Sequence, residues 1–301
     1  MAFIILKASS YLLMIIVAFM FKKIGLLKKE HGKALSYLIM RFTLPAAIIT
    51  SFASVSFESS FLYLIIFGFL GNFILMIVGF AITKRKSRND KILYTANIGY
   101  NVGNFTLPFT SSFFGPAGII STCLFDAGNA ILFLGLNYPI VEAALDKGKK
   151  ISILRILKKL FSSPSFDAYL LMVILGILKI RIPEAVSVVT AEIGKANGPM
   201  AMFMIGTMLE LNFDKKYLAF FAKMFTLRSL VAVFMSLIIY KLTFLPFEAV
   251  KAGIIACWSP MGSLGPAYTA YHGGDVELAS FANTMSIFAS LIIIPTLAIV
   301  L

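Results

Sequence analysis

Long hydrophobic stretches alternate with short polar segments along the whole chain. A hydrophobic stretch of about twenty residues forms a helix long enough to cross the hydrocarbon core of a bilayer. Ten such stretches lie at residues 3–21, 34–55, 61–82, 91–113, 118–142, 165–182, 186–209, 218–242, 248–271 and 278–301. The pattern therefore predicts an all-α polytopic membrane protein with ten transmembrane helices and short loops.

The composition excludes a soluble globular protein. Of the 301 residues, 59% are hydrophobic and 14% are charged, whereas a soluble domain has about 45–50% and about 25%. The mean hydropathy is +0.91. Cys123 and Cys257 each lie inside a hydrophobic stretch without a neighbouring cysteine, so the sequence predicts neither a disulfide nor a metal site.

The net charge of +13 is distributed unevenly among the loops. Eighteen Lys and Arg residues lie in or next to the loops after the first, third, fifth and seventh stretches, whereas the other loops contain only Lys179, Arg181, Lys241 and Lys251. Basic loops stay on the cytoplasmic side of a membrane. We therefore expect a multi-pass protein of the cell membrane with both termini outside, and the basic excess requires no nucleic-acid partner.

A basic connector, residues 145–164, separates the first five stretches from the last five. Within it, residues 151–161 combine apolar Ile153, Ile156, Leu157 and Leu160 with basic Arg155, Lys158 and Lys159. This segment forms either an amphipathic helix on the inner membrane surface or a solvated linker.

Five stretches on each side of the connector predict an inverted repeat, because an odd number of crossings reverses the direction of the second half. The two repeats would comprise residues 1–144 and 165–301. Residues 41–45 correspond to residues 195–199 with a shift of 154, and Pro108 corresponds to Pro266 with a shift of 158.

Helix-breaking residues cluster in the middle of the fourth and ninth stretches. They are Gly99, Gly103 and Pro108 in the fourth, and Pro260, Gly262, Gly265 and Pro266 in the ninth. Broken membrane helices are tolerated only where they face protein or water. Paired breaks in the two halves of a repeat indicate the binding site of a transporter; the alternative is two proline kinks without a ligand.

The fourth stretch also contains three asparagines, Asn97, Asn101 and Asn104. Their spacing of four and three places them on one face wherever the helix is continuous. An amide offers donors and an acceptor without a fixed charge, which suits a carboxylate that must bind and then leave. The alternative is that these amides only form hydrogen bonds between helices.

Polar residues of the fifth and tenth stretches extend the candidate site. Asp126 is an acid inside a hydrophobic stretch, and it precedes Asn129 by three residues on the same helical face. Asn283 lies 17 residues after Pro266, as Asp126 lies 18 after Pro108, so the repeat predicts corresponding positions for them. Burial would favour a protonated, coupling Asp126, whereas a neighbouring cation would keep it charged and structural.

Two basic residues are candidate partners for Asp126. Arg41 and Lys195 lie within the second and seventh stretches, where each either supports the site or extends its charge toward the interface. Glu192 precedes Lys195 by three residues, which is the spacing of a helical ion pair.

The motifs around these residues resemble those of the auxin efflux carrier family of membrane transporters, especially its bacterial branch of malate- and malonate-permease-like proteins. The resemblance covers essentially the whole chain and rests on residues 97–108, 125–129, 266–275 and 279–283, with further matches at 43–45 and 198–201. It implies two inverted five-helix repeats whose broken helices four and nine cross near the substrate. It places Asn101, Gly103, Asn104, Pro108 and Pro266 at the crossover. Plant carriers of the long type have a large hydrophilic loop between helices five and six, whereas this chain has a short basic connector, so auxin itself is not the expected substrate.

We therefore expect a secondary transporter that moves a small organic anion by alternating access, with protons as the candidate coupling ion. The expected substrate-binding residues are Asn97, Asn101, Gly103, Asn104, Pro108, Ser259, Gly262, Gly265 and Pro266, with Asp126, Asn129, Asn283, Arg41 and Lys195 in coupling or support. A sodium- or cation-coupled carrier of the same fold and a membrane-embedded metabolite sensor remain alternatives, and a homo-oligomer stays open. No Walker A, HExxH or GxSxG motif occurs, so neither an enzyme nor a cofactor is expected.

Overall fold

The computed structural model describes residues 2–54, 58–146, 152–209, 215–242 and 244–301, and these ranges contain helices and no strand. The elements before the connector are α1 (Ala2–Lys23), α2 (Lys29–Leu38), η1 (Ile39–Thr43), α3 (Leu44–Ala53), η2 (Ser59–Leu62), α4 (Tyr63–Thr83), α5 (Arg88–Ala96), η3 (Val102–Thr106), α6 (Leu107–Phe113), α7 (Gly115–Ala130), η4 (Ile131–Leu136) and α8 (Asn137–Leu145). The following elements are α9 (Ile153–Leu160), α10 (Pro164–Ile177), α11 (Glu184–Lys195), α12 (Asn197–Met208), α13 (Lys215–Tyr240), α14 (Phe247–Cys257), α15 (Gly265–Tyr271) and α16 (Val276–Val300).

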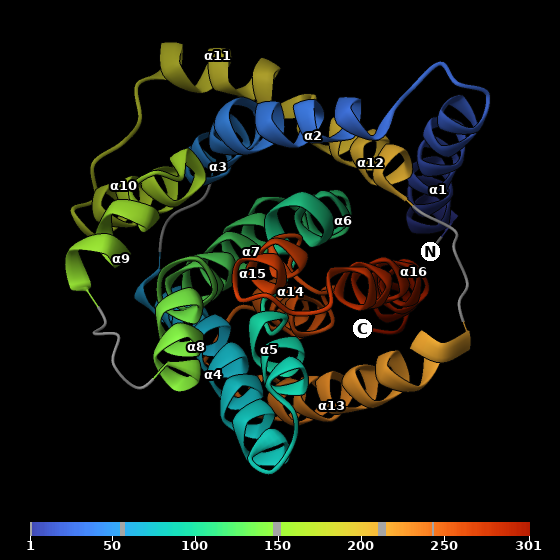
Figure 1. Cartoon of the computed structure of the whole chain (residues 1–301). Coiled ribbons are helices and arrows are strands. Elements are labelled where there is room, and N and C mark those ends of the chain that lie inside the picture. Colours follow the sequence, from blue (N-terminus) through green and yellow to red (C-terminus); the bar gives the residue numbers. More distant parts are fainter. Residues whose placement is uncertain (1, 55–57, 147–151, 210–214, 243) are drawn as a thin grey trace.

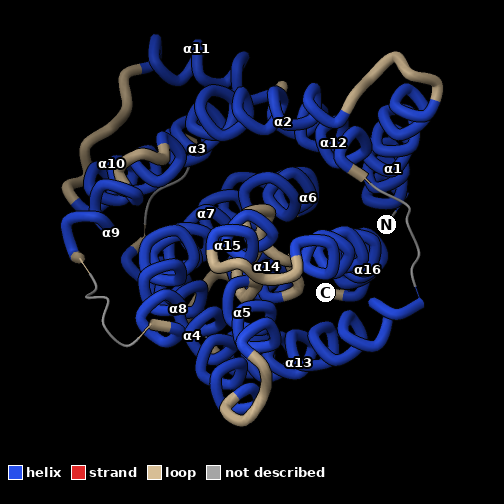
Figure 2. The backbone as a smooth tube through the Cα atoms, viewed as in Figure 1, coloured by secondary structure: helices blue, strands red, loops and turns tan. Residues whose placement is uncertain are grey.

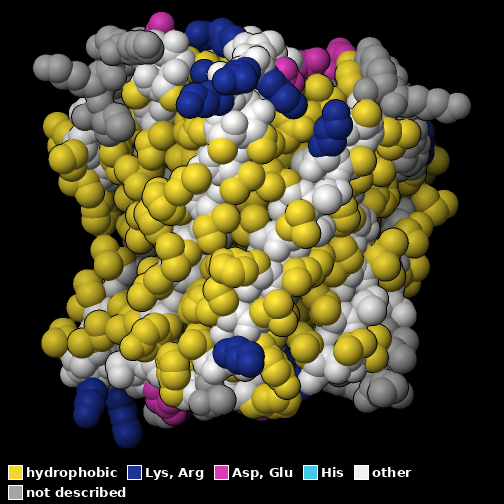
Figure 3. All heavy atoms as spheres, turned by 90° about the horizontal axis from the view of Figure 1, so that it is seen from below, with side chains coloured by type: hydrophobic (Ala, Val, Ile, Leu, Met, Phe, Trp, Pro, Cys, Tyr) yellow, Lys and Arg dark blue, Asp and Glu magenta, His cyan; other side chains and the backbone are white. Residues whose placement is uncertain are grey.

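Within the described residues, each of the ten predicted stretches consists mainly of helix, which confirms the all-α membrane class. Five helices in the described ranges are long and apolar enough to cross a bilayer: Lys29–Ala53, Ser59–Thr83, Gly115–Leu145, Tyr217–Tyr240 and Val276–Val300. On the face seen in Figure 3, hydrophobic side chains cover the middle of the molecule, and Lys and Arg side chains lie near its upper and lower edges. Ten crossings stay a prediction, because several of the remaining helices are interrupted or short.

The helices form two groups (Figures 1 and 2). The first, which we call the arc, consists of α1, α2, η1, α3, α10, α11 and α12, in which α1 packs on α12 and α11 on α3. The second, the bundle, consists of α4 to α8 and α13 to α16, in which α4 packs on α7 and α7 on α14. Both groups therefore combine helices from the two halves of the chain.

Glycines allow two helices of the bundle to approach until their backbones touch. A Cβ on Gly68 of α4 would lie 1.9 Å from the carbonyl oxygen of Phe125 in α7, and a Cβ on Gly128 would lie 1.9 Å from that of Ile65 in α4. Close contact through small residues is a common way to pack helices in membranes. It fixes α7, which carries Asp126 and Asn129.

Proline explains the widened turns of the arc and the bundle. The π-helical turns η1, η3 and η4 end two or three residues before Pro45, Pro108 and Pro139. A proline has no N–H to donate and its ring collides with the carbonyl of residue i−4, so the turn before it widens. Pro108 and Pro266 stand in the first turns of α6 and α15, where a proline is well tolerated.

The described part of the connector forms the short helix α9 and not a linker. Ile156 and Leu160 pack near Leu134 and Phe166, so one face of α9 lies on the protein. Ile153 and Leu154 remain exposed. Three basic residues that contribute to the charge asymmetry, Lys147, Lys149 and Lys150, lie outside the described residues.

Candidate functional site

The two broken helices cross in the bundle and pair through their backbones. The first break separates α5 from η3, and the second separates α14 from α15. Tyr100 and Met261 face each other in an antiparallel bridge. The N–H of Asn101 donates to the carbonyl of Pro260 at 2.9 Å, and the N–H of Gly262 donates to that of Gly99 at 2.8 Å. Each break thus satisfies backbone groups of the other, as unwound backbone within a membrane requires.

Side chains of the following helices hold both breaks. Asn129 of α7 donates to the carbonyl of Tyr100 and accepts from its N–H, both at 3.0 Å. Asn283 of α16 donates to the carbonyl of Met261 at 3.1 Å, while the N–H of Met261 donates to Ser286 at 3.0 Å. Asn129, and not Asp126, therefore plays the role that corresponds to Asn283, and the two lie 154 residues apart.

Arg228 of α13 is a central residue that the sequence analysis missed. Its guanidinium is buried and donates to the carbonyls of Ile98 at 2.7 Å, Asn97 at 3.4 Å and Ser259 at 3.4 Å. It also lies over the ring of Tyr100 at 4.8 Å. A cation at these carbonyls stabilises the ends of both α5 and α14, because the C-terminal end of a helix is partially negative.

The C-terminal parts of the two breaks, next to η3 and α15, line a cavity of about 70 Å³ between the bundle and the arc. Six predicted site residues line it: Asn101, Gly103, Asn104, Asp126, Asn129 and Gly262. Residues that the sequence analysis did not select also line it, including Ser165, Tyr169 and Ser263. Val102 and Gly103, at the start of η3, also line the cavity, and the start of a helix is partially positive.

Asp126 joins the bundle to the arc at this cavity. Its carboxylate accepts hydrogen bonds from Asn129 at 2.8 Å and from the hydroxyl of Tyr169 in α10 at 2.8 Å. The backbone N–H of Gly103 makes a further hydrogen bond to it. These donors are neutral, and of the two candidate cations Arg41 lies over Tyr37 and Lys195 pairs with Glu192 in the described structure.

The three asparagines do not share one face, because the helix ends at Ala96. Asn97 turns away from the cavity and donates to Leu93 and Thr269, both at 3.0 Å. Asn101 and Asn104 line the cavity and are 6% exposed. Within the described residues the buried amide oxygen of Asn104 has no hydrogen-bond partner, so this oxygen can still accept a hydrogen bond from a donor group.

The other predicted site residues support the crossover without lining the cavity. The hydroxyl of Ser259 lies 2.6 Å from that of Thr106. Gly265 leaves room for Asn97, whose amide oxygen would lie 2.2 Å from a Cβ at that position. Pro108 and Pro266 begin the helices that follow the breaks.

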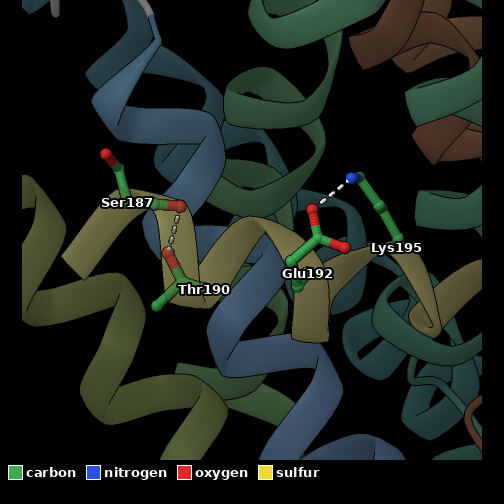
Figure 4. A network of polar contacts seen from close by, with 4 residues as sticks. All are labelled: Ser187, Thr190, Glu192 and Lys195. Carbon is green, nitrogen blue, oxygen red and sulfur yellow. Dashed lines mark hydrogen bonds and ion pairs between the residues drawn. The ribbon is translucent and has the colours of Figure 1, made fainter. Parts of the chain in front are cut away.

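The two predicted basic residues lie away from the cavity of about 70 Å³. Arg41 is exposed in η1, with its guanidinium over the ring of Tyr37 at 4.5 Å. Lys195 forms the predicted ion pair with Glu192 on α11 (Figure 4), and both side chains are largely exposed. Thr190 of the same helix accepts a hydrogen bond at 3.0 Å from Thr50 of α3.

The fold and the crossover define a helical membrane protein built around two interrupted helices. A family model described as "membrane transport protein" matches residues 4–301. The chain therefore belongs to the membrane transport protein family, which is the auxin efflux carrier family. It is a family of transporters. Among curated proteins, no sequence matches the chain.

Proposed function

We propose that the protein is a secondary transporter that moves a small organic anion, a carboxylate or dicarboxylate, across the cell membrane. The observation that carries this proposal is the polarity of the crossover. Arg228 occupies the negative ends of α5 and α14, whereas the η3 end and Asn104 face the cavity. Backbone N–H groups and amides at the start of a helix are suited to a carboxylate that binds reversibly.

Asp126 supports coupling of this transport to protons. A charged Asp126 already occupies the N–H of Gly103, and a second carboxylate in the same low-dielectric cavity would be repelled. Protonation of Asp126 removes that repulsion and frees positive potential for the substrate. Substrate and proton would then bind together, and an inward proton gradient would drive uptake.

Alternating access would occur between the arc and the bundle. Tyr169 belongs to the arc and Asp126 to the bundle, so their hydrogen bond spans the boundary that must rearrange. We further propose that the chain crosses the membrane ten times as two inverted repeats, residues 1–144 and 165–301, with both termini outside. The matching roles of Asn129 and Asn283 support this repeat.

The site is tested in proteoliposomes by counterflow of labelled malonate and malate. Asn101→Ala and Asn104→Ala should each weaken substrate affinity by roughly 1–3 kcal/mol, because a hydrogen bond to a charged group is lost. Ser121→Ala is the matched control, since Ser121 is buried in α7 and bonds only to a carbonyl of its own helix in the described structure. Unchanged affinity in both asparagine variants, with monodisperse protein, would place the site elsewhere.

Coupling is tested with Asp126→Asn, which preserves the shape of the side chain and removes its titration. The native protein should concentrate substrate along an inward proton gradient, and the variant should exchange substrate without concentrating it. A variant that still concentrates substrate would end the proton proposal and leave transport intact. Dependence on sodium would favour the sodium-coupled alternative, and binding without any flux would favour a sensor.

A further inference from the structure

A second and larger cavity, of about 250 Å³, adjoins the crossover cavity. Its lining residues are Tyr37, Met40, Arg41, Leu134, Lys159, Ser162, Ser163, Pro164 and Leu264. Four of them, Met40, Leu134, Ser163 and Leu264, also line the crossover cavity. The two cavities therefore share part of their lining, from which we infer one passage, and the larger cavity, which we call the mouth, lies where η1, α9 and α10 meet.

The mouth has two cations among its lining residues and no acid. Arg41 comes from η1 of the arc, and Lys159 comes from the connector helix α9. The Lys159 ammonium lies over the rings of Tyr268 at 4.3 Å and Tyr138 at 5.4 Å. Aromatic faces attract a cation without carrying a full negative charge, so both residues bring positive charge to the lining of the mouth.

Lys159 is partly withdrawn from water, and this burial lowers the pKa of its ammonium. An anion bound beside it would offset that cost. Lys158 and Lys33 are exposed and do not line the mouth. Arg41 and Lys159 thus line the mouth, whereas exposed residues such as Lys158 and Lys33 contribute only to the excess of basic residues on one side of the membrane.

We propose that Arg41 and Lys159 form a second anion site, in which the carboxylate of the transported substrate is held at the mouth before it reaches the crossover. This site rests on the proposed transport of organic anions. Lys159 also contacts Tyr268 of α15, the helix after the second break. The same side chain therefore lines the mouth and packs on the helix that follows the crossover. The ligand must therefore be an oxyanion that is small enough to enter the mouth.

The local potential of the mouth is measured with a cysteine at Ser162, an exposed lining residue. Both native cysteines are buried, so Ser162→Cys is the reactive position in the purified protein. Its reaction rate with an anionic methanethiosulfonate, relative to a cationic one, reports the potential. Lys159→Gln and Arg41→Gln should each lower this ratio roughly 3- to 10-fold, as expected for loss of a unit charge a few ångströms away.

Two matched variants and two additives complete the experiment. Lys33→Gln on α2 and Lys223→Gln on α13 remove the same charge from exposed positions on other helices and should leave the ratio nearly unchanged. Malonate should slow labelling of Ser162→Cys, and Lys159→Gln should abolish that protection. Phosphatidylglycerol in otherwise phosphatidylcholine nanodiscs tests the alternative that a lipid headgroup supplies the oxyanion.

The outcomes separate this site from the transport function. Equal changes in the ratio for the lining and control lysines would overturn the proposal, because they would report only the general surface charge. Protection by phosphatidylglycerol alone would also overturn it, since the site would then belong to lipid. Malonate counterflow that persists without any protection at Ser162 would refute the mouth site while keeping the transporter. Failure of malonate and malate in both assays would instead reject the proposed substrate class.

Discussion

Removal of the Arg228 guanidinium should loosen the crossover while most of the fold persists. In Arg228→Met, the carbonyls of Ile98, Asn97 and Ser259 lose their charged donor. The 2.7 Å bond is worth about 1.5–3 kcal/mol as a hydrogen bond to a charged group, and the desolvated contact with Tyr100 adds up to about 2 kcal/mol. The two 3.4 Å bonds add less, so we expect a loss of roughly 3–5 kcal/mol.

The nearby Cys257 makes this loss measurable. Cys257 is 3% exposed and lines a small cavity together with Arg228, whereas Cys123 lies fully buried in α7. A loss of about 3 kcal/mol raises the population of a locally open crossover by about 10²-fold. Labelling of Cys257 by a thiol reagent, followed by mass spectrometry, should accelerate accordingly, whereas labelling of Cys123 should change little.

Two variants of the same helix define the control and the intermediate case. Lys223→Met removes an exposed cation from α13 and should leave Cys257 protected. Arg228→Lys keeps the charge but lacks the planar guanidinium that donates to several carbonyls at once. Its Cys257 labelling rate should therefore lie between those of the native protein and the methionine variant. Unchanged protection of Cys257 in a folded Arg228→Met protein would refute the view that this guanidinium holds the two breaks together.

Further predictions concern the packing and the orientation. Gly68→Ala and Gly128→Ala each place a methyl group 1.9 Å from a carbonyl oxygen of the facing helix. Because this overpacks a backbone contact, the free energy of unfolding should fall by about 3 kcal/mol or more. A native melting temperature in either variant would contradict the packing. For the orientation, a cysteine at exposed Ser59 should react with an impermeant thiol reagent in intact cells, whereas one at exposed Ser87 should be shielded. Labelling of Ser87 from outside would reverse the proposed topology.

Sequence pattern alone determined the class of this protein and most of its helices. Hydrophobic stretches long enough to cross a bilayer are a local property, so their positions follow from composition without knowledge of contacts. The break near Gly99 and Gly103 was also predictable, since glycine and proline act on their own backbone. The family resemblance of the motifs around Asn101 and Pro266 was confirmed by the family match over residues 4–301.

The tertiary structure decided which polar groups meet. Asn97 was expected beside Asn101 and Asn104, but the helix ends at Ala96 and its amide turns to Thr269. For Asp126 the sequence left open whether a cation such as Arg41 or Lys195 lies beside it, and the structure shows partners that include Tyr169, 43 residues further along the chain. Such pairings depend on how the helices pack, and residue spacing carries no information about them.

The sequence shows that Arg228 lies in an apolar stretch, but it does not show which groups Arg228 binds. An arginine inside the apolar stretch 218–242 could have been selected by the rule that selected Asp126, because a buried charge in a membrane requires a partner. Its partners are backbone carbonyls from two other helices. Every residue has a backbone carbonyl, so the sequence cannot show which carbonyls Arg228 binds. The tertiary structure shows them, because the two breaks cross beside Arg228.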